Sequence, residues 1–256
     1  MGIPIRAVGF VILGATLGSG ALAQEQEAPL IIPVDVMTCS YRDGKGPSDL
    51  DAAVDAWNAW VDASGRPEVY SAWTLTKHYT GPEQDFDVAW LGAWKNAREM
   101  GAGMDNYLAN AGEIQAGFAE VVACDTTSNF ASLNMRPTPN NDTPSNGVLT
   151  MSDCNLEEGA RTEDLNAAMA AWSAVLDEHQ LEAGIFHWYP VFGGGQEFDF
   201  KWVEAFGSHT AFGAYYEAMA NGGLYRKSTE LFDRVVSCDV ARAYNVQNRR
   251  FTQLRK

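Results

Sequence analysis

The sequence predicts an α+β protein made of two tandem copies of one unit of about 100 residues, close to the commonest domain size. Three observations predict this. Blocks of internal similarity recur in the same order, strand and helix patterns alternate within each copy, and a Pro- and Asn-rich segment separates the copies. We place the first copy at residues 34–131 and the second at residues 148–247.

The internal similarity consists of three blocks whose offset changes only slightly, from 115 to 112 to 114. The matched residues are Cys39/Cys154, Leu50/Leu165 and Trp57/Trp172 in the first block, residues 84–90 and 196–202 in the second, and Cys124/Cys238 in the third. Conserved order with small offset changes indicates a duplication whose insertions lie in loops.

Each copy begins with a short alternating segment, which is typical of a strand, and continues with a helix that has one apolar stripe. Two β-rich runs separated by turn residues follow and predict a hairpin. A second helix then starts at a good N-cap and ends near a glycine, before a last strand with two valines. In the two copies these elements are residues 34–39 and 149–154, 48–62 and 163–177, 69–79 and 185–192, strands from Phe86 and Phe198, helices from Asn96 and Ser208, and strands at 121–122 and 235–236.

This order, β-α-β-β-α-β, is that of the ferredoxin-like unit. Two such units in one chain resemble the dimeric α+β barrel superfamily, in which two sheets pack face to face. The resemblance implies an intramolecular pseudo-dimer, in which fusion supplies the second subunit.

The ferredoxin-like order makes the first and last strands of each unit antiparallel neighbours. It therefore implies two equivalent bridges, Cys39 with Cys124 and Cys154 with Cys238. A bridge between Cys39 and Cys154, or free buried thiols, are the alternatives.

The ends of the chain and the segment between the copies have their own character. Residues 1–23 combine Arg6, an apolar run and Ala21-Leu22-Ala23, the pattern of a cleaved signal peptide, so we expect a periplasmic or extracellular protein with disulfides. Residues 132–147 are expected to form an exposed linker, and residues 248–256 a solvated basic tail. After cleavage, 17 basic and 33 acidic residues leave a net charge of −16. This charge argues against nucleic acid and the membrane as partners.

The candidate catalytic residues are His187 and Asp199. Asp199 belongs to the shared Phe-Asp-x-x-Trp pattern and is followed by Lys201, so it is either a half-buried acid/base group or a structural carboxylate. His187 lies in the strand segment Phe186-His187-Trp188-Tyr189, where it is either a general base or a packed side chain. Our alignment sets His187 against Leu75. The histidines have no metal-ligand spacing, so no dedicated metal site is expected.

The candidate ligand-binding residues are in the second copy and have no counterpart in the first: His187, Trp188, Tyr189, Lys201, His209 and Tyr216. We therefore expect one pocket per chain, in the second copy. The first functional hypothesis is binding of a small apolar or aromatic ligand in a cleft between the two repeats. The alternatives that the resemblance implies are a cofactor-independent monooxygenase or isomerase, and a haem protein with His187 as the iron ligand. Fold alone does not separate these functions.

Overall fold

The computed structural model describes residues 31–138 and 146–254, which we divide into a first half (31–136) and a second half (147–250). The elements of the first half are β1 (Ile31–Tyr41), α1 (Pro47–Ala63), β2 (Tyr70–Tyr79), β3 (Val88–Trp94), α2 (Ala97–Asn110), α3 (Gly112–Val121) and β4 (Val122–Arg136). Those of the second half are β5 (Gly147–Leu156), α4 (Thr162–Glu178), β6 (Gly184–Phe192), β7 (Phe200–Phe206), α5 (His209–Ala220), α6 (Leu224–Phe232), β8 (Val236–Cys238) and β9 (Arg242–Arg250).

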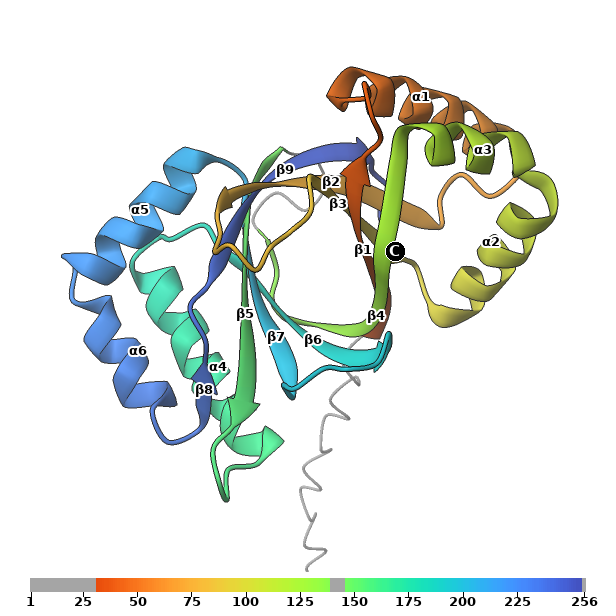
Figure 1. Cartoon of the computed structure of the whole chain (residues 1–256). Helices are drawn as coiled ribbons and strands as arrows, with labels where there is room; N and C mark the ends of the chain where they lie inside the picture. Colours follow the sequence, from red (N-terminus) through yellow and green to blue (C-terminus); the bar gives the residue numbers. More distant parts are fainter. Residues whose placement is uncertain (1–30, 139–145, 255–256) are drawn as a thin grey trace, which may run out of the picture.

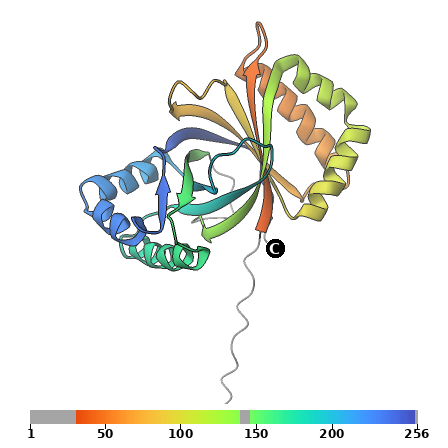
Figure 2. The ribbon, with the colours of Figure 1, turned by 60° about the horizontal axis from the view of Figure 1, so that its bottom comes forward.

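The strands form an antiparallel barrel of eight strands, in the order β7-β6-β4-β1-β3-β2-β9-β5, which closes through the pairing of β5 with β7. The short strand β8 pairs with β5 at its end. Within the described residues, α1, α2 and α3 cover one side of the barrel and α4, α5 and α6 the opposite side (Figures 1 and 2). The predicted α+β class is confirmed.

Two strand pairs join the halves. β4 of the first half pairs with β6 of the second, and β9 of the second half pairs with β2 of the first. The last long strand of each half thus lies beside a strand of the other half, and the barrel cannot close within one half.

These pairings explain two differences from the sequence analysis. The expected linker is shorter, because β4 extends to Arg136 and β5 begins at Gly147. The expected basic tail is partly structural. The side chain of Arg249 is 9% exposed and pairs with Asp51 at 2.6 Å, and that of Arg250 pairs with Asp62 at 2.8 Å, so both residues fasten β9 to α1. The predicted signal peptide, residues 1–23, and Arg255 and Lys256 lie outside the described residues.

Other sequence-based expectations are confirmed. One disulfide joins Cys39 to Cys124 and the other joins Cys154 to Cys238, each between two antiparallel neighbouring strands. The matched tryptophans, Trp57 and Trp172, are buried. α3 and α6 were not predicted, because each continues the predicted second helix past its glycine stop as a further short helix.

The apolar side chains gather in three main clusters. One fills the barrel interior and includes Leu75, Phe130 and Trp188. The other two lie outside the barrel, between the sheet and the helices of each half, and contain Trp57 and Trp172. No helix in the described parts of the chain is long and apolar enough to span a membrane.

The bridges lead to a stability prediction. Each disulfide joins residues far apart in sequence, 85 positions for Cys39 and Cys124, and so restricts the unfolded chain. Replacing Cys39 and Cys124 together by Ala should lower the free energy of unfolding by about 2–5 kcal/mol. Urea titration of the oxidised protein and the variant measures the difference, and the wild type under reducing conditions is the control. A difference near zero would contradict the structural role of the bridge.

Candidate functional site

A cavity of about 820 Å³ lies in the first half, between the outer face of the sheet and helices α1, α2 and α3. Aromatic and thioether side chains dominate its lining: Trp57, Trp60, Tyr70, Trp90, Trp94, Tyr107, Phe118, Met37, Met100 and Met104. Its volume lies in the range of small-molecule sites, which are mostly apolar with a few placed polar groups. Met104 is 39% exposed, so the lining reaches the protein surface. We call this space the first-half cavity.

Helix α2 forms one wall of the cavity. Met100, Gly103, Met104 and Tyr107 follow the i, i+3, i+4, i+7 spacing of one helix face, and all four line the cavity. No residue of α2 is buried, as is also true of α5 in the second half, whereas α1 buries four residues of its stripe. The apolar face of α2 therefore points toward the cavity.

The lining also contains polar groups, and those around Asp35 are hydrogen-bonded. The Asp35 carboxylate, on β1, accepts hydrogen bonds from Trp94 Nε1 at 2.6 Å and Asn129 Nδ2 at 2.7 Å. Beside it, Trp90 Nε1 donates to the Tyr70 hydroxyl at 2.8 Å. Burial raises the pKa of Tyr70 well above its usual value, so this phenol stays protonated.

At two positions of the same layer the second half has larger side chains, whereas at a third it has Phe206 in place of Trp94. Strands β3 and β7 align at an offset of 112, so Phe200, which is fully buried, stands where the first half has Val88. At the same offset, Tyr215 of α5 stands where α2 has Gly103. The Tyr215 ring packs on Phe206 at a centroid distance of 5.2 Å. This cavity belongs to the first half, and the expected pocket in the second half stays a prediction.

His187 does not line the first-half cavity. It pairs with Trp202 on β7, as Thr74 pairs with Trp90 on β3, so its structural counterpart is Thr74 and not Leu75. A shift of one residue in a strand turns a side chain to the other face. His187 accordingly lies in the helix layer, fully buried beside Phe200 and Trp202, with no hydrogen-bond partner for either ring nitrogen among the described residues. Burial lowers the pKa of His187 to about 3.

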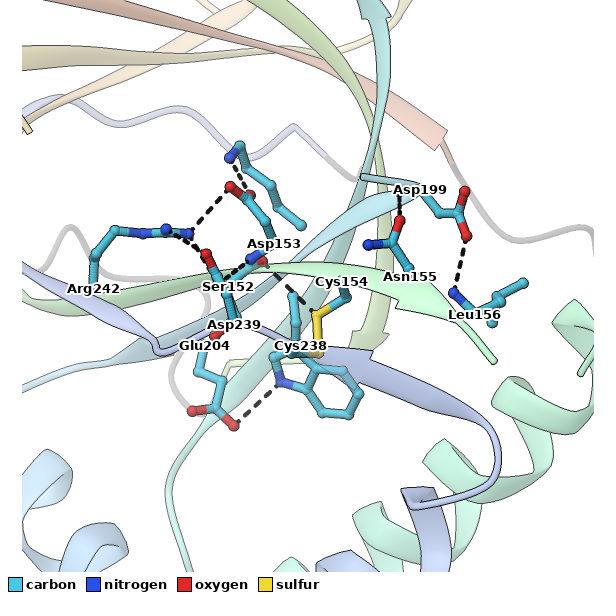
Figure 3. The surroundings of a disulfide bond; sticks show 12 residues. Ser152, Asp153, Cys154, Asn155, Leu156, Asp199, Glu204, Cys238, Asp239 and Arg242 are labelled. Atoms are coloured by element: carbon cyan, nitrogen blue, oxygen red, sulfur yellow. Dashed lines mark hydrogen bonds and ion pairs between the residues drawn. A yellow bond between two sulfur atoms is a disulfide. The ribbon is translucent and has the colours of Figure 1, made fainter. Parts of the chain in front are cut away.

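Asp199 and Lys201 have separate partners. Figure 3 shows Asp199 beside Leu156 and Asn155 and apart from Asp153, which is the partner of Lys201. Asp199 precedes β7 and accepts the backbone N–H of Leu156 at 2.9 Å, as Asp87 accepts that of Tyr41 at 2.8 Å in the first half. Lys201 instead forms an ion pair with Asp153, which also contacts Arg242 at 3.3 Å. These contacts correspond to the structural alternative for the shared Phe-Asp pattern.

The other candidate residues are dispersed. Trp188 belongs to the barrel interior, and Tyr189 to the helix layer of the second half. Tyr216 is 67% exposed on α5. His209 contacts His78 with ring centroids 5.0 Å apart, and its Nε2 lies 2.9 Å from Asn245 Oδ1. The structure does not assemble the six candidates in one pocket, and their individual roles stay predictions.

The arrangement does not fit His187 as the iron ligand of a haem. Its ring is enclosed by aromatic side chains, and no histidine of the described chain lines the first-half cavity. Nor do the described residues contain a group of three or more His, Cys, Asp or Glu side chains placed to hold a metal ion.

The sequence analysis missed the residues that form the cavity. The expected site residues were large or reactive side chains present in one copy, whereas the cavity lining includes the small Val88, and Gly103 makes room for the ring of Trp94. Two glycines within the second predicted helix, Gly101 and Gly103, are the signal that was available, because glycine inside a helix usually has a packing or functional reason.

Comparisons with known proteins support the fold. No family model and no curated protein matches the sequence. A mutant chlorite dismutase from Candidatus Nitrospira defluvii superposes with a TM-score of 0.50 and 8% identity, over 84% of this chain and 91% of that one. A protein classed by name as a chlorite dismutase gives 0.50 and 14%, over 86% and 96%. A Fusobacterium nucleatum protein classed by name as a monooxygenase gives 0.51 and 10%, over 85% and 92%. At these identities the likeness shows the fold alone.

The buried imidazole leads to a pH prediction. An unfolded histidine has a pKa near 6.5, whereas burial lowers that of His187 to about 3, so the neutral ring is favoured by folding. Its contribution is present above pH 6.5 and is lost as the pH falls toward 3. Between pH 6.5 and 5, the free energy of unfolding should fall by about 2 kcal/mol.

Urea titrations across this range should show a clearly smaller fall in a His187→Leu variant. Replacing the exposed His179 by Gln is the matched control and should leave the fall unchanged. Equal pH dependence in wild type and His187→Leu would contradict the burial of a neutral imidazole.

Proposed function

We propose that this chain, which has the fold of the dimeric α+β barrel superfamily, is an exported protein that binds a small aromatic or apolar ligand in the first-half cavity. The observation that carries the proposal is a space of about 820 Å³ lined mainly by aromatic and methionine side chains, with a few polar groups among them. Burial of an aromatic molecule against such a lining is favourable through loss of water-exposed apolar area.

The comparison of the halves supports a ligand-binding role. The recurring disulfides, helix tryptophans and strand order support the interpretation that two ferredoxin-like repeats form the barrel. In that case the second half shows how the helix layer packs when it is full, with Phe200 and Tyr215 in place. The first half has the smaller Val88 beside the cavity in place of Phe200, and a binding role accounts for the packing that this difference costs.

The site that we propose differs from the expected cleft between the repeats. The barrel interior, where the strands of the two halves meet, holds a hydrophobic core that includes Phe130, Trp188 and Val203. The cavity lies outside the barrel and belongs to one half, so the enzyme alternative based on His187 and Asp199 receives no support from the cavity lining. The export that we propose agrees with two disulfides, which form in oxidising compartments.

Filling the cavity tests this function. Val88→Phe copies the residue that fills the second half and should weaken binding of a neutral aromatic probe, N-phenyl-1-naphthylamine, at least tenfold, because the ring takes the volume that the probe needs. Probe fluorescence and quenching of the lining tryptophans measure the affinity and a stoichiometry of one per chain.

Phe200→Val is the reciprocal control. It should lower stability but leave the probe affinity within twofold of the wild type, because it alters the other half. Undiminished binding by Val88→Phe, or loss of binding in Phe200→Val alone, would place the probe elsewhere and overturn the proposal.

A further inference from the structure

We infer that the ligand of the first-half cavity is an aromatic molecule that carries a protonated amine, with the amine held against Asp35. This inference rests on the proposed function, because it specifies the ligand class of the same cavity. It follows from the surroundings of Asp35, from the equivalent region of the second half, and from the charges that line the cavity.

The Asp35 carboxylate accepts hydrogen bonds but pairs with no cationic side chain among the described residues. Its two hydrogen-bond donors, the Trp94 indole and the Asn129 amide, are both neutral. In the described parts of the chain, Asp35 takes part in no ion pair. It is half-buried and lines the cavity, where a charged partner would strengthen the hydrogen bonding that neutral donors leave weak.

The second half has a different carboxylate, Glu204, on the equivalent rung of its ladder. Asp35 lies opposite Gly92 in the β1–β3 ladder, and Glu204 lies opposite Thr150 in the β5–β7 ladder, so one rung of each half carries a carboxylate on exchanged strands. The Glu204 carboxylate accepts the Tyr215 hydroxyl at 2.7 Å and the Trp202 indole at 3.3 Å. A helix side chain thus brings an aromatic ring and a hydrogen-bond donor to this carboxylate.

The first half lacks that side chain, because Gly103 stands where α5 has Tyr215. The Tyr70 hydroxyl occupies the space above Gly92 and accepts the Trp90 indole, in the role that Glu204 has toward Trp202. The ring of Trp94 instead packs directly against Gly103, and its indole donates to Asp35 as Tyr215 donates to Glu204. Asp35 also lines the cavity, so a ligand can reach it there. The partner that Asp35 still lacks is a cation, and a ligand with a ring and a positive charge would supply it.

The charges favour an amine over a neutral or acidic donor. Of the two arginines that line the cavity, Arg66 is paired with Glu99 and Arg42 donates to the carbonyl oxygen of Ala119. The lining carboxylates Asp35 and Asp125 form no ion pair in the described residues. The many aromatic faces attract cations, and an acidic protein repels anions.

Three indoles with one ring system test the inference: tryptamine, 3-methylindole and indole-3-acetate. Each is titrated into the full-length mature protein as a competitor of N-phenyl-1-naphthylamine. We expect tryptamine to bind at least tenfold more tightly than 3-methylindole, and indole-3-acetate more weakly than both. Asp35→Asn should remove the preference for tryptamine and keep the affinity for 3-methylindole, because the shape of the site is preserved.

Asp125→Asn is the matched control. It changes the net charge of the protein by the same amount and also lines the cavity, so it should retain at least half of the preference if the contact with Asp35 is specific. Thermal unfolding of both variants checks that they fold. Binding of the probe and of 3-methylindole without a preference for tryptamine, or equal loss in both variants, would overturn the inference alone. Failure of the probe and all three indoles to bind would overturn the proposed function itself.

Discussion

Closure of the barrel through strand pairing between the halves is the constraint on which the rest of the structure depends. β9 pairs with β2 and β4 pairs with β6, so neither half can satisfy the backbone of its edge strands alone. The ion pairs of Arg249 and Arg250 hold β9 on α1. With the barrel interior taken up by a shared core, each half still has to cover the outer face of its strands with its own helices. Packing can therefore change in one helix layer without disturbing the barrel.

The two helix layers share a frame, by which we mean the helix tryptophan, the strands under it and the disulfide, and they differ in the other side chains. In both, a buried helix tryptophan meets a strand tryptophan or a phenylalanine edge-on, as in the contacts of Trp57 with Trp90 and of Trp172 with Phe232. Around this frame the second half adds the rings of Phe200, His187 and Tyr215, whereas the first half has Val88, Thr74 and Gly103. One disulfide in each half ties β1 to β4 and β5 to β8, so the strands stay in place although the side chains around them differ.

The sequence predicted the frame because repetition and periodicity report it directly. The cysteine pairing, the buried tryptophans and the helix N-caps at Asn96 and Ser208 were all readable from matched positions. The cavity could not be predicted in this way. It depends on how side chains of different size meet in space, and that gives no periodic pattern along the sequence. The one-residue error that set His187 against Leu75 had a similar origin, because strand register depends on pairing with β7 and not on spacing along the chain.

Glu204, in the helix layer of the second half, is a carboxylate that accepts hydrogen bonds from side chains on several elements. Burial raises the pKa of Glu204, while hydrogen bonds from Tyr215, Trp202 and Thr150 lower it, so the side chain depends on donors that the second half itself supplies. Asp35 is in the corresponding layer with donors from Trp94 and Asn129 only, and α2 contributes none. Asp35 also lines the cavity and has no cationic partner among the described residues. A bound molecule can therefore add a charged contact to this carboxylate, in addition to the hydrogen bonds that the chain supplies.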